Sequence, residues 1–252
     1  MCQTACMPRS QDAFDALLRH IQPGVICDVG SMDATESLRF RHLCPSARVI
    51  AFEANPHNYA RILLDPQVKA AGIEVVHAAA TNMEGEAIFH VLEPTADKAW
   101  AKGASSLRKS ASGAGVPTRE VTVPALRLDG YLSGVAGHIV LWIDVEGAAA
   151  EVVEGLAGIA DRVAAIHIEV EHGEFWEGQE TAGAVLARLR AMGFRAVASV
   201  ADWSGQDNVI LIRPELVRRV PLLVHMARLQ RYLRALALRA RRVAPSVSLY
   251  KR

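Results

Sequence analysis

The sequence predicts an α/β fold with about seven strands in one mostly parallel sheet and helices on both faces. Short apolar runs of β type alternate with helical patterns along most of the chain, and this alternation is typical of parallel sheets covered by helices. The composition agrees, since 51% hydrophobic and 22% charged residues supply a sizeable core and exclude global disorder. The 252 residues suit one large domain, or one domain with an appendage.

The first part of the chain predicts three strands with two helices between them. The strands are apolar runs that lie beside turn or helix-cap residues. The second helix has a clear start, because Asn55 is followed by Pro56, and a capping side chain before a proline is a common helix N-terminus. The expected strands span residues 25–29, 48–53 and 73–79, and the expected helices span residues 35–43 and 56–64.

Residues 86–128 interrupt this alternation, and we expect an inserted hairpin with a long loop. The two flanks, 86–92 and 120–126, alternate like antiparallel strands. Between them, residues 98–118 are rich in Gly, Ser, Ala and Lys. A loop of that length in a compact domain is often functional, so the sequence predicts a mobile lid here.

The alternation resumes after this insertion and ends in a hairpin. Residues 139–145 form a continuous apolar run that predicts a buried strand, and Gly193 is placed to end the last helix. The expected strands span residues 139–145, 163–170, 194–200 and 208–213, and the expected helices span residues 148–160 and 181–192.

Charge divides the chain into two parts. From Pro214 onward the net charge is +9, whereas residues 1–213 carry −8. We therefore expect an α/β domain over residues 1–213, with the insertion at 86–128, and a basic helical extension over residues 214–252. Apolar residues four and three apart within 216–243 place one apolar stripe along that helix. The stripe can pack on the acidic body, contact a membrane surface or a partner protein, or pair two subunits as a homodimer.

No pattern in the sequence directs the chain to a membrane or an oxidising compartment. The longest apolar runs are far shorter than the roughly 20 residues of a membrane span. The start of the chain lacks the basic-then-apolar order of a secretory signal. Four cysteines without a C-x-x-C pair indicate neither a disulfide framework nor a metal site. We expect a cytoplasmic protein.

Two strand ends carry residues that suit a nucleoside ligand. Asp28 and Gly30 end the first strand, where a glycine permits a tight turn and leaves the amides of the following helix open to a ligand. Glu53 ends the second strand, 23 residues after Gly30, near the spacing at which an acidic side chain binds both ribose hydroxyls. The turn at 30–35 has one glycine, unlike the glycine-rich turn of dinucleotide sites. An acid before the turn also suits an ammonium group, so S-adenosylmethionine fits better than a dinucleotide.

Three sequence strings in these regions resemble a known family, the FkbM-type methyltransferases. They are D-V-G at 28–30, F-E-A-N-P at 52–56 and I-D-V-E-G at 143–147, the last followed by E-V-V-E-G-L at 151–156. The family consists of S-adenosylmethionine-dependent enzymes with a Rossmann-like, seven-stranded fold, and the likeness covers residues 25–213. The resemblance therefore implies a methyltransferase.

The resemblance also implies which residues bind S-adenosylmethionine. The implied cofactor contacts are Asp28, Gly30, Ser31, Glu53, Ala54 and Ala79. The first three would hold the methionine end, the carboxylate of Glu53 would hold the ribose, and the backbone of Ala79 would border the adenine. Three positions depart from the family, which usually has Asn, Gly and Lys where this sequence has Met32, Ala34 and Trp142.

Acidic side chains at later strand ends are candidates for catalysis. Asp144 and Glu146 lie on one face of a predicted strand end, where they can orient an acceptor, act as general base or share a divalent metal. His172 follows the next strand beside carboxylates and is a second candidate base, whereas His167 is expected in the core. We expect Asp144 or His172 to act as base and Glu146 to orient the acceptor, and we assign no metal ligand.

The expected function is O-methylation of a hydroxyl on a small molecule, such as a sugar, a polyketide-like natural product or a glycolipid. One alternative is a nucleic-acid methyltransferase that grips phosphates with its basic tail. The acidic body and the absence of an aromatic-rich strand argue against a nucleic-acid partner. The other alternative is a non-catalytic interaction protein built on the same fold.

Overall fold

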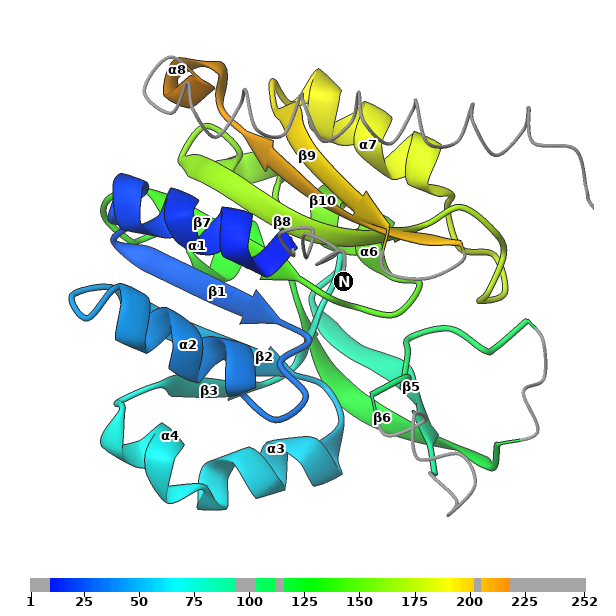
Figure 1. Cartoon of the computed structure of the whole chain (residues 1–252). Helices are drawn as coiled ribbons and strands as arrows, with labels where there is room; N and C mark the ends of the chain where they lie inside the picture. The colour runs from blue at the N-terminus through cyan, green and yellow to red at the C-terminus, as the bar shows by residue number, and fades with distance from the viewer. Residues whose placement is uncertain (1–9, 94–102, 112–115, 202–204, 218–252) are drawn as a thin grey trace, which may run out of the picture.

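The computed structural model describes residues 10–93, 103–111, 116–201 and 205–217 (Figure 1). The main strands span Val25–Val29 (β1), Arg48–Glu53 (β2), Glu74–His77 (β3), Ile139–Ile143 (β7), Val163–Glu171 (β8), Arg195–Ala201 (β9) and Gln206–Ile212 (β10). They form one seven-stranded sheet in the order β3-β2-β1-β7-β8-β10-β9. The strands from β3 to β8 run parallel, and β10 enters antiparallel between β8 and β9. The predicted fold class is confirmed.

Helices cover both faces of this sheet, as predicted. One face carries α1 (Ser10–Ile21), α2 (Thr35–Leu43), α3 (Pro56–Leu64) and α4 (Pro66–Ala70), and the other carries α5 (Leu128–Tyr131), α6 (Ala149–Glu154) and α7 (Ala182–Ala191) (Figure 1). Successive β1 residues alternate between the two cores, since Ile26 packs under α1 and α2 while Cys27 packs under α6. Burial on both faces explains why the strands read as continuous apolar runs.

The third predicted strand, residues 73–79, is two strands in the structure. β3 ends at His77, where the amide of Ala78 donates a hydrogen bond to the carbonyl of Val76 at 3.1 Å. The chain then enters a second sheet as β4 (Ala79–Ala80). That smaller sheet has the order β4-β6-β5, with β5 at Gly85–Leu92 and β6 at Thr118–Leu126. The predicted antiparallel hairpin is confirmed as the β5–β6 pair.

The predicted helix at 148–160 is also shorter than expected. α6 ends at Glu154, and a single 3₁₀ turn, η2 (Ala157–Ile159), follows. Gly155 follows α6 directly and lies close to the segment after β4, since a Cβ atom there would lie 2.2 Å from the carbonyl oxygen of Thr81.

Two regions of the sequence prediction lie partly outside the described residues. Of the predicted lid at 98–118, the described part forms isolated bridges from Ser106 to His90 and from Ser110 to Trp176. Of the basic extension, only α8 (Pro214–Val217) belongs to the described part of the chain, so the expected helix over 216–243 lies almost wholly outside it. Among the helices that the structure describes, none has the length and apolar character needed to cross a bilayer.

Candidate active site

A pocket opens at the carboxyl ends of β1, β2 and β7. Its walls are the turn after β1, the end of β2, β4, residues 103–107 and residues 144–148. In open α/β sheets, ligands bind at this edge where the strand order reverses, and β1 lies between β2 and β7 at that point. Of the residues that the sequence predicts for the site, the pocket is lined by Gly30, Glu53, Ala54, Ala79, Asp144 and Glu146.

Gly30 allows the ends of β1 and β7 to meet. Its φ is +87°, and a Cβ atom there would lie 2.0 Å from the carbonyl oxygen of Asp144. The amide of Asp144 donates to the carbonyl of Val29 at 2.9 Å, which fixes the same approach from the other strand. Only glycine fits this position, so the turn brings a ligand at β1 close to the acidic end of β7.

The turn after Gly30 has a left-handed backbone at two residues that are not glycine. Met32 has a φ of +49° and Ala34 a φ of +62°. The family resemblance placed Asn and Gly at these two positions, and those residue types adopt left-handed backbone most readily. Met32 and Ala34 therefore hold a backbone conformation that Asn and Gly adopt at lower cost. The amide of Met32 is held by a 2.6 Å hydrogen bond to Oε2 of Glu53.

Glu53 presents a buried and fixed carboxylate to the pocket. The side chain is 5% exposed, and its Oε1 accepts the amide of Asn55 at 2.7 Å while Oε2 accepts the amide of Met32. Burial raises the pKa of Glu53, and the hydrogen bonds from Asn55 and Met32 oppose that rise. Each oxygen retains a further lone pair, so the carboxylate can accept two hydroxyls of a ribose.

Asp28 lies behind the pocket rather than in its wall. It is 1% exposed on the face toward α2, where it accepts the hydroxyl of Ser37 at 2.6 Å, and burial raises its pKa to about 7. Ser31 is also buried outside the pocket lining, although both of its neighbours, Gly30 and Met32, line the pocket. The Ser31 Oγ atom finds no hydrogen-bond partner among the described residues. This buried hydroxyl beside the wall fits a polar group of a bound cofactor.

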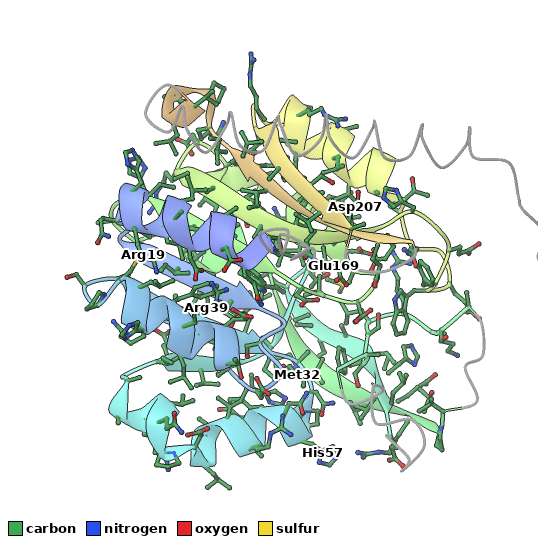
Figure 2. All side chains as sticks on the ribbon, viewed as in Figure 1. Arg19, Met32, Arg39, His57, Glu169 and Asp207 are labelled. Atoms are coloured by element: carbon green, nitrogen blue, oxygen red, sulfur yellow. The ribbon has the colours of Figure 1, made fainter. Side chains whose placement is uncertain are left out.

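Asp144 and Glu146 bring two carboxyl groups to the pocket. Glu169 of β8, which Figure 2 labels, adds a third carboxyl group nearby. One oxygen of each of the three lies within 4.8 Å of the others, a spacing that a divalent cation can also bridge. Burial, followed by the charges of Asp144 and Glu171, raises the pKa of Glu146 to about 8. At neutral pH the Glu146 carboxyl is therefore mostly protonated and can donate a hydrogen bond.

The candidate base His172 and the expected core residue His167 both lie away from this pocket. His172 is more than half exposed after β8, outside the pocket lining, and its Nε2 atom lies 3.2 Å from the carboxylate of Asp207 on β10 (Figure 2). The structure does not bring it together with Asp144. His167 is 1% exposed and stacks on Trp142 at 3.5 Å, which confirms its place in the core. Trp142, which stands where the family usually has lysine, packs against Phe14 of α1. This position therefore lies on the face of the sheet that α1 covers.

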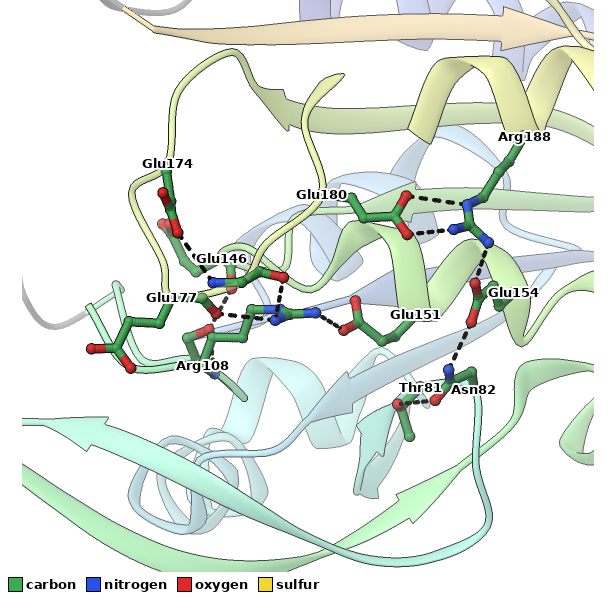
Figure 3. A network of polar contacts seen from close by, with 12 residues as sticks. Thr81, Asn82, Arg108, Glu146, Glu151, Glu154, Glu174, Glu177, Glu180 and Arg188 are labelled. Atoms are coloured by element: carbon green, nitrogen blue, oxygen red, sulfur yellow. Dashed lines mark hydrogen bonds and ion pairs between the residues drawn. The ribbon is translucent and has the colours of Figure 1, made fainter. Parts of the chain in front are cut away.

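A second set of contacts beside the pocket comes from residues 103–111, all of which belong to the predicted lid at 98–118. The hydroxyl of Ser106 donates to the backbone carbonyl of Glu146 at 2.5 Å. Arg108 forms an ion pair with Glu151 and donates to the carbonyls of residues 177 and 178 (Figure 3). These contacts join residues 103–111 to α6 and to the loop after β8. No local spacing rule could have indicated them.

Comparison with known proteins places the chain in a family. The family model described as the methyltransferase FkbM domain matches residues 28–196. The 2-O-methyltransferase NoeI of Sinorhizobium fredii is 29% identical over 198 residues, which cover 75% of this chain and 79% of the relative.

Two solved structures illustrate the similarity to known folds. The N-terminal domain of EvdMO1, crystallised in the presence of SAH and D-fucose, has 11% identity and a TM-score of 0.47 over 81% of each chain. Fibrillarin of Aeropyrum pernix, with natively bound S-adenosyl-L-methionine, has 12% identity and a TM-score of 0.47 over 80% of this chain and 74% of its own. The fold itself rests on the seven-stranded sheet described above. The match over residues 28–196 contains both the turn after β1 and the acidic end of β7, and the chain belongs to the FkbM family of S-adenosylmethionine-dependent methyltransferases.

Proposed function

We propose that this protein transfers the methyl group of S-adenosylmethionine to a hydroxyl group of a small molecule. One observation carries the proposal: Asp144 and Glu146 line the same pocket as Glu53 and Ala79. A nucleoside-binding edge and a pair of carboxyl groups thus face one space. The relative named as a 2-O-methyltransferase supports oxygen as the accepting atom. The acceptors we propose are sugars, polyketide-like natural products and glycolipids.

The chain would hold the cofactor along the edge formed by β1, β2 and β4. Glu53 would accept the ribose hydroxyls, and the backbones of Ala54 and Ala79 would border the adenine. Gly30 leaves room for the methionine end, where the Ser31 hydroxyl is a buried polar group without another partner in the described chain. Asp28 would act indirectly, because its hydrogen bond to Ser37 fixes the start of α2.

S-adenosylmethionine, when bound, supplies an electrophilic methyl group on a sulfonium. The protein must align the acceptor oxygen, exclude water and take up the proton of the hydroxyl. Asp144, an exposed carboxyl group at the pocket wall, is the proposed base. Glu146, protonated below pH 8 or so, would donate a hydrogen bond that orients the acceptor. The geometry favours Asp144 over His172, which lies outside the pocket lining beside Asp207.

The test supplies S-adenosylmethionine labelled with ¹³C on the methyl group to the full chain, together with a panel of hydroxylated acceptors, and locates the label by NMR. We expect an O-methyl product. We expect Asp144→Asn to lower the rate by about 10²-fold or more, with S-adenosylhomocysteine binding nearly unchanged. The matched control is Glu93→Gln, an exposed carboxylate paired with Arg119 outside the pocket.

Two results would count against the proposal. Label found on nitrogen would replace hydroxyl acceptors with amines. The second result is a chain that binds the cofactor but transfers no label to any acceptor. If Asp144→Asn also bound the cofactor as wild type does, a non-catalytic interaction protein would be favoured.

A further inference from the structure

Residues 103–111, called the wall segment from here on, form one side of the pocket. The lining includes Gly103, Ser105, Ser106 and Leu107. The wall segment contains neither a helix nor a strand longer than an isolated bridge, at Ser106 and at Ser110. A segment without regular structure has few backbone bonds of its own, so its position depends on the contacts that its side chains make.

Arg108 joins the wall segment to two other parts of the chain. Its Nη1 atom donates to the carbonyl oxygens of Glu177 and Gly178, at 3.1 and 2.7 Å, in the loop between β8 and α7. Its Nη2 atom forms an ion pair with Glu151 of α6 (Figure 3). The two charged side chains are only 22% and 21% exposed, so water screens their attraction less than at an open surface. One guanidinium thus connects the wall segment, α6 and the loop after β8.

The contacts of Arg108 need the shape of a guanidinium. Arginine offers five N–H donors in a planar fork, whereas the lysine ammonium is a single nitrogen. Arg108 uses one nitrogen for the two carbonyls and another for the carboxylate. The partner backbone is suited to it, because Gly178 has a φ of +66° and a Cβ atom there would lie 3.3 Å from Nη1 of Arg108. Glycine at 178 therefore leaves room for the guanidinium.

The position of Arg108 is linked to the pocket through Ser106. The amide of Arg108 donates to Oγ of Ser106 at 3.0 Å, and the same hydroxyl donates to the backbone carbonyl of Glu146 at 2.5 Å. Ser106 is 2% exposed, so water does not compete for these bonds. On the other side of Arg108, the amide of Glu177 donates to the carbonyl of Lys109 at 2.8 Å. A displacement of Arg108 would therefore shift Ser106 at the pocket.

We propose that Arg108 is a positioning residue, which holds the wall segment against the pocket and so slows the release of the cofactor. This inference rests on the proposed function only in placing the cofactor in this pocket. Arg108 is not part of the pocket lining, so it acts through residues 103–107. Without the guanidinium, the wall segment loses its side-chain contacts with α6 and with the loop after β8. It would then open more often, and a bound ligand would leave faster.

The first experiment measures the release of S-adenosylhomocysteine from the full chain and needs no acceptor. Radiolabelled S-adenosylhomocysteine is bound and then chased with an excess of the unlabelled compound. We expect Arg108→Gln to raise the dissociation rate by about tenfold, and Arg108→Lys, which keeps the charge on a single nitrogen, to raise it less. The matched control is Lys109→Gln, which removes an exposed charge paired with Glu120 and should leave the rate unchanged. An unchanged rate in Arg108→Gln would overturn the proposal.

The second experiment locates the loosened segments by amide hydrogen exchange in the chain bound to S-adenosylhomocysteine. In Arg108→Gln we expect faster exchange at residues 103–111 and 173–180, with β1 and β7 as protected as in wild type. Faster exchange throughout the main sheet would mean that Arg108 supports the stability of the whole domain, and the positioning role would be wrong. Faster release without faster exchange in either segment would also contradict it.

The third experiment separates the two contacts of the guanidinium by a double-mutant cycle on the dissociation rate. We expect Glu151→Gln to raise the rate less than Arg108→Gln does, because the two carbonyl bonds remain. Added to Arg108→Gln, it should have no further effect. Independent, additive increases would mean that Arg108 does not act through Glu151, and the connection to α6 would be wrong.

The failures of the two proposals can be told apart, because these experiments follow only the release of a bound ligand. A chain that methylates no hydroxyl, yet releases S-adenosylhomocysteine faster in Arg108→Gln, would lose the proposed function and keep the role of Arg108. A chain that forms an O-methyl product, with the same release rate in wild type and Arg108→Gln, would keep the function and lose that role.

Discussion

The Glu53 carboxylate allows a quantitative prediction for cofactor binding. Its two oxygens already accept the amides of Met32 and Asn55, at 2.6 and 2.7 Å, so they are fixed before any ligand binds. Hydrogen bonds to a charged group contribute about 1.5–3 kcal/mol each. Glu53→Ala removes both ribose bonds and costs about 3–6 kcal/mol, which corresponds to roughly 10²- to 10⁴-fold weaker binding.

Glu53→Gln is a subtler change with a smaller expected effect. It keeps the size of the side chain but replaces one oxygen by an NH₂ group. Since both oxygens face backbone amides, one of those amides loses its acceptor in either orientation of the new side chain. One ribose bond is lost, so we expect binding to weaken by roughly 10- to 10²-fold. Either the turn at Met32 or the start of α3 at Asn55 would also loosen, which would lower the melting temperature.

The assay is calorimetric titration of wild type, Glu53→Gln and Glu53→Ala with S-adenosylhomocysteine. Glu93→Gln serves as the control, since this exposed side chain pairs with Arg119 outside the pocket lining. Thermal unfolding of each variant separates loss of binding from loss of fold. If a folded Glu53→Ala variant bound within about threefold of wild type, the assignment of Glu53 to the ribose would be refuted.

Three further predictions concern the turn, the buried acids and the acidic end of β7. Gly30→Ala should lower the free energy of unfolding by about 3 kcal/mol or more, because its Cβ atom would lie 2.0 Å from the Asp144 carbonyl oxygen. The control is Gly72→Ala, where φ is +61° but the surrounding space is open, and there the free energy of unfolding should fall by only about 1 kcal/mol. Burial raises the pKa of Asp28 to about 7, so the folded state keeps a proton that the unfolded chain releases above about pH 4. The free energy of unfolding should therefore fall by at most about 4 kcal/mol as the pH rises to 8. Asp28→Asn should flatten that decline in unfolding measured at pH 5 and pH 8, and an unchanged slope would contradict the assignment. Methyl transfer should survive EDTA, because the proposed mechanism uses Asp144 as base and Glu146 to orient the acceptor and assigns no metal ligand. A rate that is lost in EDTA and restored by added Mg²⁺ would instead show that a cation binds the three carboxyl groups.

The sheet was predictable because parallel strands that are buried on both faces appear in the sequence as short, continuous apolar runs. The predicted strands at 25–29 and 48–53 match β1 and β2 at both ends. The sequence analysis missed α1, although Phe14, Leu17 and Leu18 are buried along one face at helical spacing. The end of α6 at Glu154 was not predicted, and the contact between Gly155 and Thr81 was not predictable, because these two residues lie far apart in the sequence.

For the site, the sequence by itself determined which strand ends line the pocket. Gly30, Glu53, Asp144 and Glu146 follow their strands at positions that the parallel topology must bring to one edge. Only the tertiary structure decided which of the remaining candidates reach the pocket. Asp28 is turned toward Ser37 of α2, and His172 is turned toward Asp207, because the direction of a side chain at a strand end depends on what packs beside it.

The contacts around Glu146 were decided by tertiary structure alone. Ser106, Arg108 and Trp176 come from two loops separated from Glu146 by tens of residues, and no periodicity links them. Local sequence patterns report helix and strand periods, which act over a few residues. Loop-to-loop hydrogen bonds form only after the sheet has brought the two loops together. The sequence therefore determined the fold and the strand ends that line the pocket, and packing determined how the loops beside Glu146 are joined.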